Sequence, residues 1–233
     1  YCLSLYNKTL PIIKKLGYIP VGLGDDKFSE EWLKDNTHKN ISSKNKYYGE
    51  YTFHYWFWKN ELPKIEDAHW IGFCAYKRYW GNKNKIDRDS RLEDIVIKKI
   101  PIEWEKFDTV IGEHIYINDL KLSKLVKHGI WSLVRNPSAL FKSRRNIRFH
   151  FDMWHGNGNL DKAIDLLDNE RADFRKYTQK NISFSDGAMF VCRSKKLLNN
   201  YYNSLFPWLE RCEKIFGFNL KGYNNRIYAF LAE

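Results

Sequence analysis

Short apolar runs separated by polar turns predict several buried strands along the chain. The sharpest transition lies in His69–Trp80, HWIGFCAYKRYW, which begins as an apolar and aromatic run without charge. Lys77 and Arg78 then stand among three aromatic rings. Ligands of open α/β sheets bind outside the carboxyl ends of strands, and Lys and Arg there suit phosphate. The pattern is compatible with a ligand site, and equally with an edge strand that runs into a solvated basic turn.

Helical and strand-like patterns alternate through the rest of the chain. Residues 44–62 carry aromatic residues at helical spacing until Pro63 ends the run, and Ser42 or Ser43 is a suitable N-cap. The chain has no internal repeat and no linker, which predicts a single domain. Further strands are predicted at 1–5, 18–21, 107–112 and 182–193, and further helices at 10–16, 92–100, 160–167, 197–216 and 222–233.

Two groups of polar residues interrupt apolar patterns and are candidates for chemistry, and a third group is discounted. Glu50 and His54 lie four residues apart on one predicted helix face, so they could pair, as a structural anchor or as site residues. Asp186 stands at a glycine break in an apolar run, where it is either a turn former or a site residue. Residues 87–89 spell DxD, a metal-binding pattern, but they lie in a polar run beyond the strand end and are discounted.

Composition narrows the class of protein. Hydrophobic residues make up 43% of the 233, which indicates a folded globular chain. The formal charge of +11 favours an anionic partner, namely nucleic acid, acidic lipid or a phosphorylated ligand. The four cysteines are scattered without CxxC spacing, which predicts buried thiols and neither a disulfide framework nor a zinc site. No apolar run reaches spanning length, and the chain starts at Tyr1 without Met, as a fragment would.

The segment from Lys121 to Phe151 holds eight cations and no acid. Trp131 and several aliphatic residues are interleaved with these cations. Basic residues beside Trp and Leu are typical of a segment that lies against anionic lipid. A solvated insertion that covers the core edge is an equally good interpretation, and no nucleic-acid-binding module is recognisable.

Several long motifs resemble one bacterial family. They are YIPVGLG, DNTHKNISSKNKYYGEYTFHYWFWKN, WIGFCAYKRYW, GAMFVCRSKKLLNNYYNSLFPWLERCEK and NRIYAFLAE. In this order they are similar to the exopolysaccharide and capsule biosynthesis family catalogued as domain of unknown function 4422. Members are regarded as glycosyltransferases of the GT-A type, some of which transfer galactofuranose from its uridine diphosphate. The resemblance covers nearly the whole chain, and the family pattern continues past Glu233.

The resemblance implies an α/β fold, a GT-A-like and Rossmann-related mixed sheet flanked by helices in one domain over 1–233, with a basic insertion at about 118–150. It also implies a uridine diphosphate sugar as donor and a polysaccharide or glycolipid as acceptor. Cytoplasmic localisation, with peripheral contact on the inner face of an anionic membrane, fits such an acceptor. The alternatives are a sugar- or lipid-binding module without catalysis and, less well supported, a basic nucleic-acid-binding protein.

Site residues follow from the same resemblance. Lys77 and Arg78 occupy the place where GT-A enzymes normally carry a metal-binding DxD, so they would hold the pyrophosphate without a required metal cofactor such as Mn²⁺ or Mg²⁺. Asp186 is the favoured base for the acceptor hydroxyl, ahead of Glu50 and His155. The remaining donor-binding candidates are Tyr6, Asp35, Asn40, Lys44, Asn45, Tyr76 and Tyr79.

Five positions depart from the family pattern. Ala75 stands where the family usually has His, and Lys77 where it has Arg. His38-Lys39 replaces a Gly-Asp pair, and Ala188 replaces Asn. Because a His and an Asn are lost, the sequence does not determine the donor sugar.

Overall fold

The computed structural model describes residues 1–82, 90–117, 122–185 and 187–233, with side chains in those ranges except at 122–128. Contacts divide the chain into two compact units. Unit 1 comprises Tyr1–Gly112 and Gly187–Asn203, and unit 2 comprises Glu113–Asp186 and Ser204–Glu233. Each unit therefore contains segments that are far apart in the sequence. The single domain expected over 1–233 stays a prediction.

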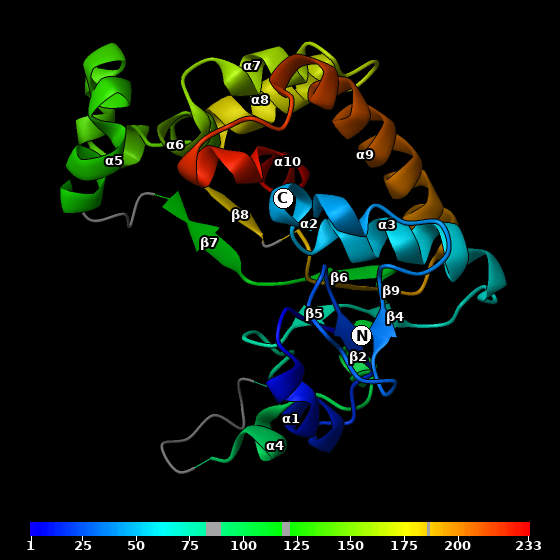
Figure 1. Cartoon of the computed structure of the whole chain (residues 1–233). Coiled ribbons are helices and arrows are strands. Elements are labelled where there is room, and N and C mark those ends of the chain that lie inside the picture. The colour runs from blue at the N-terminus through cyan, green and yellow to red at the C-terminus, as the bar shows by residue number, and fades with distance from the viewer. Residues whose placement is uncertain (83–89, 118–121, 186) are drawn as a thin grey trace. The chain divides into compact units, whose positions relative to one another are not determined.

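Unit 1 is built on a parallel four-stranded sheet with the order β3-β2-β1-β5. A second, antiparallel sheet has the order β4-β9-β6. The run His69–Trp80 supplies β4 and β5, so it is divided between the two sheets at Phe73 and is not one long strand. The strands are β1 Cys2–Ser4, β2 Pro20–Gly22, β3 Leu33–Lys34, β4 Ile71–Gly72, β5 Cys74–Ala75, β6 Thr109–Ile111 and β9 Phe190–Cys192 (Figure 1).

The helices predicted over 44–62 and 92–100 in unit 1 are shorter than expected, whereas the helix predicted over 197–216 begins two residues earlier. The expected helix over 44–62 is broken at Gly49, whose positive φ of 56° ends α2 before α3 begins. Ser42 begins a 3-10 turn and does not cap a helix through its side chain. The helix expected at 92–100 reaches only Ile95. The helices are α1 Leu10–Lys15, α2 Asn45–Tyr48, α3 Tyr51–Asn60, α4 Leu92–Ile95 and the start of α9 Lys195–Phe216.

Aromatic rings form the centre of unit 1. Phe73 is fully buried, and its ring centre lies 5.1 Å from those of both Phe57 on α3 and Phe190 on β9. This packing joins the aromatic helix to both sheets. All four cysteines are buried free thiols, as predicted from their spacing.

Unit 2 combines one antiparallel strand pair with helices. β7 His114–Tyr116 pairs with β8 Ser183–Ser185. The apolar run 182–193 forms two strands, β8, which ends at Ser185, and β9, which begins at Phe190. The Asn146 side chain caps the next helix by accepting a hydrogen bond from the Phe149 N–H. The helices are α5 Leu122–Arg135, α6 Ile147–His155, α7 Asn159–Ile164, α8 Arg171–Lys180, the end of α9 and α10 Ile227–Ala232. The strand β7 and the helices α5, α6 and α8 were not among the predicted elements.

The chain is thus a mixed α/β protein with a parallel sheet accompanied by helices, which confirms the predicted fold class. Among the described helices, none has the length and apolar character needed to cross a bilayer.

Candidate functional site

The parallel sheet has a reversal of strand order between β1 and β5. From β1 the chain moves outward through β2 to β3 on one side, whereas β5 pairs on the other side. Such a topological switch point is where open α/β sheets bind ligands, outside the carboxyl ends of the strands. The residues that follow β1 and β5 therefore define the candidate site, which we call the switch-point edge.

Two predicted donor-binding tyrosines meet at the switch-point edge. Tyr6 follows β1 and Tyr76 follows β5, and their ring centres lie 5.4 Å apart in an edge-to-face arrangement. Tyr6 is 45% exposed, so its ring presents surface to solvent. Two hydrogen bonds fix its backbone: the Tyr6 N–H donates to Ser4 Oγ at 3.0 Å, and the Tyr6 carbonyl accepts from Thr9 Oγ1 at 2.7 Å.

Cations surround these rings. Ala75 and Arg78 close a tight turn through paired backbone hydrogen bonds of 3.2 and 2.8 Å, and this turn exposes Lys77 and Arg78. Lys77 Nζ lies 5.1 Å from the Tyr76 ring centre, and interaction with Tyr76 raises the pKa of Lys77. Lys8 Nζ lies 5.6 Å from the Tyr6 ring centre, a contact that the sequence reasoning missed. The edge thus combines one exposed ring, Tyr6, and one half-buried ring, Tyr76, with exposed cations.

Asp35 directly follows β3 and is fully buried. Its Oδ1 accepts from the Gly24 N–H at 3.1 Å, and its Oδ2 accepts from Thr52 Oγ1 at 2.6 Å. Burial raises the pKa of Asp35 to about 6. The Asn45 amide donates to Thr52 Oγ1 and to the Gly49 carbonyl at 3.0 and 2.9 Å. Asp35 and Asn45 therefore hold the turn after β2 against the start of α3. Thr52, which bonds to both of them, was not among the predicted site residues.

The other candidates of unit 1 also make local contacts. Asn40 bonds its own turn: its amide donates to the His38 carbonyl, and its Oδ1 accepts from Ser42. Lys44 Nζ lies 5.9 Å from the Tyr48 ring centre. The Tyr79 hydroxyl donates to the Tyr76 carbonyl at 2.9 Å, and its ring stacks on Tyr18 in the core beside α1. Burial raises the pKa of Tyr79 to about 12.

Glu50 is half-buried at the start of α3, and His54 lies one turn later. The His54 ring nitrogens lie 2.9 Å from the Tyr202 hydroxyl and 3.2 Å from the Ala188 carbonyl. Burial lowers the pKa of His54 to about 4, so the ring is neutral. His54 thereby anchors the backbone two residues after Asp186. Asp186 itself and the DxD at 87–89 lie outside the described residues.

His155 belongs to unit 2, at the end of α6. It is 1% exposed and packs on Phe151 and Phe230, with ring centres 4.9 and 4.4 Å away. Within the described part of the chain, neither of its ring nitrogens has a hydrogen-bond partner. Burial, with the nearby His150 and Arg226, lowers the pKa of His155 to about 3.

The chain matches a family model described as "Domain of unknown function (DUF4422)" over residues 2–233. The chain belongs to this family. The match runs through both units, so the family architecture includes the switch-point edge and the α5–α6 region alike.

One solved structure supports the fold assignment for this DUF4422 chain. It is the apo structure of WbbM, a bifunctional glycosyltransferase, with a TM-score of 0.56 and 21% identity. The similarity covers 86% of this chain and 34% of WbbM, so the chain spans about a third of the length of that protein. No curated protein matches the sequence. Among the described residues, no group of three His, Cys, Asp or Glu side chains could hold a metal ion.

Proposed function

We propose that this DUF4422 chain is a glycosyltransferase that moves a hexose from a uridine diphosphate sugar to a surface polysaccharide or glycolipid. The observation that carries the proposal is the switch point between β1 and β5, where Tyr6, Tyr76 and Lys77 gather. Aromatic rings suit a nucleobase, and exposed cations suit a diphosphate. The similarity in fold to WbbM is consistent with this function.

The chemistry proposed for the edge is electrostatic. As the glycosidic bond to the donor breaks, negative charge develops on the departing diphosphate, and fixed cations stabilise it. Lys77 and Arg78 supply this charge, and Lys8 adds a third cation beside Tyr6. A metal ion is not required in this scheme. Asp35 and Asn45 contribute by holding the turn after β2. Asn40 and Lys44, which precede Asn45 closely in the chain, are the further donor-binding candidates.

Asp186 is the proposed base that deprotonates the acceptor hydroxyl. A general base works best when its pKa lies near the operating pH, and the pKa of His155, about 3, makes that imidazole a weak base. His54 bonds to the carbonyl of Ala188, which stands two residues after Asp186 in the sequence. Glu50 remains the second candidate.

The test is transfer of labelled sugar from a panel of uridine diphosphate hexoses, including the galactofuranose donor, with and without a chelator. We expect transfer to persist with chelator, whereas full dependence on added Mn²⁺ would overturn the metal-free scheme. Arg78→Ala should weaken donor binding roughly tenfold to a hundredfold, since a charge-assisted hydrogen bond contributes about 1.5–3 kcal/mol. The matched control is Lys106→Ala, an exposed cation of unit 1 outside the edge.

Two outcomes would replace the proposal. Nucleotide-sugar binding without transfer would identify a non-catalytic binding module. Normal donor affinity in both Lys77→Ala and Arg78→Ala would remove the diphosphate from this edge. Thermal shift with each donor separates these cases, because it reports binding independently of turnover. We further propose that the chain works at the cytoplasmic side of the membrane, where nucleotide sugars are supplied.

A further inference from the structure

Helix α5 of unit 2 leaves large apolar residues exposed to solvent and turns small residues toward its neighbour α6. Toward α6, two of the three residues it presents are small: a Cβ added at Gly129 would lie 2.7 Å from Met153 Cγ, and Ser132 is 4% exposed. The third, Leu133, is partly buried against Phe149 and Met153. Toward solvent it presents Trp131, 74% exposed, and Val134, 65% exposed. A helix that covers a core normally buries its large apolar residues. This exposure argues against the interpretation of the basic segment as an insertion that covers the core edge.

The orientation of α5 is fixed by specific contacts. Ser132 Oγ donates to Asn157 Oδ1 at 3.2 Å, next to the close approach at Gly129. Ala139, just beyond the helix, is buried in a cluster with Phe149 and Met153 of α6. A rotation of α5 that buried Trp131 would expose this cluster, and it would place a larger side chain in the narrow space that Gly129 occupies next to Met153. The outward direction of the apolar residues is therefore part of the folded unit.

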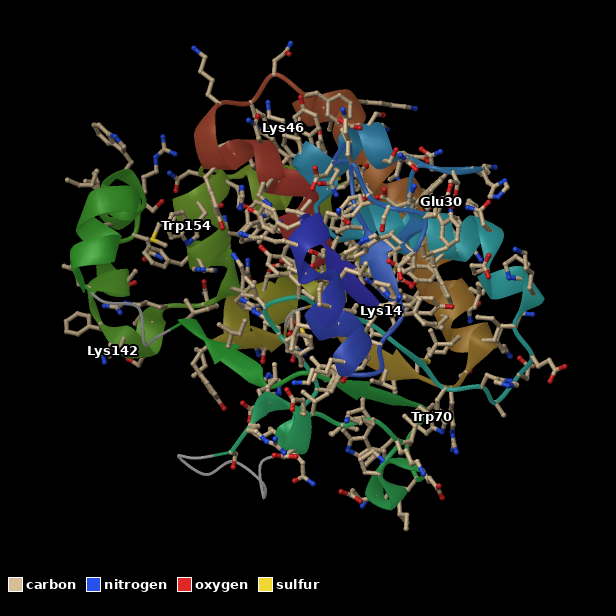
Figure 2. All side chains as sticks on the ribbon, turned by 60° about the horizontal axis from the view of Figure 1, so that its bottom comes forward. Lys14, Glu30, Lys46, Trp70, Lys142 and Trp154 are labelled. Atoms are coloured by element: carbon tan, nitrogen blue, oxygen red, sulfur yellow. The ribbon has the colours of Figure 1, made fainter. Side chains whose placement is uncertain are left out.

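The exposed face continues past the helix and is bordered by positive charge. We call it the α5 apolar face, made of Ile130, Trp131, Val134, Leu140 and Phe141, each more than half exposed. Arg135, Lys142 and Arg144 are exposed beside it, and Figure 2 marks Lys142 in the segment that follows α5. Arg145 differs, because it is buried and donates to the Ala139 carbonyl at 2.9 Å. No acidic residue occurs between positions 121 and 151.

We infer that the α5 apolar face binds the surface of an anionic lipid bilayer. Exposed Trp, Phe and aliphatic residues enter the boundary between headgroups and acyl chains, and flanking Lys and Arg attract anionic headgroups. The absence of acids from the segment favours lipid over a protein surface, since a protein interface usually mixes charges of both signs. The inference rests on unit 2 alone and does not depend on the proposed donor site.

The experiment is co-sedimentation of the chain with vesicles of phosphatidylcholine alone or mixed with phosphatidylglycerol. We expect binding to the mixed vesicles and at least tenfold weaker binding to phosphatidylcholine alone. Trp131→Ser with Phe141→Ser should reduce binding about tenfold or more, whereas Ile102→Ser, which removes an 82% exposed apolar residue of unit 1, should not. Circular dichroism of each variant verifies folding.

A second pair of variants tests the charge. Lys142→Glu with Arg144→Glu should reduce binding to anionic vesicles about tenfold or more. Lys214→Glu with Lys221→Glu makes the same change in net charge at exposed positions elsewhere in unit 2 and should have a smaller effect. If both pairs of substitutions reduced vesicle binding equally, the inference that binding depends on the α5 apolar face would be overturned. An absence of vesicle binding, with self-association that Trp131→Ser abolishes, would assign the face to a protein partner.

Discussion

Asp35 and His155 are both buried polar side chains, yet their surroundings differ. Asp35 accepts two hydrogen bonds from the protein, whereas both His155 nitrogens lack a partner among the described residues. A buried group without a partner costs the full loss of hydration, and a bonded one recovers most of it. The two side chains therefore make different contributions to stability, which can be measured separately.

Asp35→Asn should change how stability depends on pH. The folded pKa of about 6 exceeds an unfolded value of about 3.9, so the folded state binds more protons between these values. The unfolding free energy of the natural chain therefore falls as pH rises from 4 to 7, by about 2–3 kcal/mol relative to Asp35→Asn. Urea unfolding of both proteins at the two pH values measures this difference. Parallel pH profiles would contradict it.

His155→Phe should leave stability unchanged or raise it by about 1 kcal/mol, because two buried nitrogens without partners are removed. Sugar transfer should persist, as expected if Asp186 is the base. His54→Phe is the matched contrast: it removes the hydrogen bonds that join His54 to the Tyr202 hydroxyl and the Ala188 carbonyl and should cost about 2 kcal/mol. Loss of transfer in folded His155→Phe would instead assign the role of base to His155.

At the scale of the element, Gly49 decides where the aromatic helix begins. Its φ of 56° and ψ of −133° are accessible to glycine and strained for other residues. The Gly49 carbonyl accepts from the Asn45 amide at 2.9 Å and from Thr52 Oγ1 at 3.1 Å. One glycine thus separates α2 from α3 and joins the network that holds Asp35.

Gly49→Ala should lower the unfolding free energy by about 1–3 kcal/mol, the cost of a side chain in this backbone region. The control is Gly112→Ala, since a Cβ there meets nothing within 4 Å and its φ is not positive. Chemical denaturation compares the two. Similar losses in both variants would show that Gly49 carries no special strain.

At the scale of the molecule, buried titratable groups determine the response to acid. Burial lowers the pKa values of His54 and His150 to about 4, and His155 is lower still. These rings stay neutral when folded but bind protons when unfolded, so stability is lost as pH falls below about 6.5. Asp35 and Asp152, each with a pKa raised by burial to about 6, act in the opposite direction.

Lowering the pH from 7 to 5 should therefore reduce the unfolding free energy by about 3 kcal/mol, because three histidines outweigh two carboxyls. Urea unfolding at the two pH values tests this balance. His155→Phe should remove about 2 kcal/mol of the loss, since one of the three proton uptakes disappears. A stability that rises on acidification would show that the carboxyls dominate.

Local patterns in the sequence determined much of this protein. The apolar runs placed most strands of unit 1, the scattered cysteines are buried thiols, and the predicted interruption of the run 182–193 separates β8 from β9. These features depend on neighbours within a few residues, which apolar periodicity and glycine chemistry report directly. The long aromatic motifs also indicated the family to which the chain belongs.

Tertiary structure decided which distant residues meet. Tyr6 lies beside Tyr76, Asp35 beside Thr52, and His54 beside Ala188, because strand order and helix packing brought these segments together. The exposure of a side chain also depended on distant residues. The composition around Trp131 suited either lipid contact or coverage of the core, and the close packing of Gly129 on α6 leaves the Trp131 ring exposed to solvent. Burial and partnership are properties of the assembled chain, since each depends on what the opposing element presents.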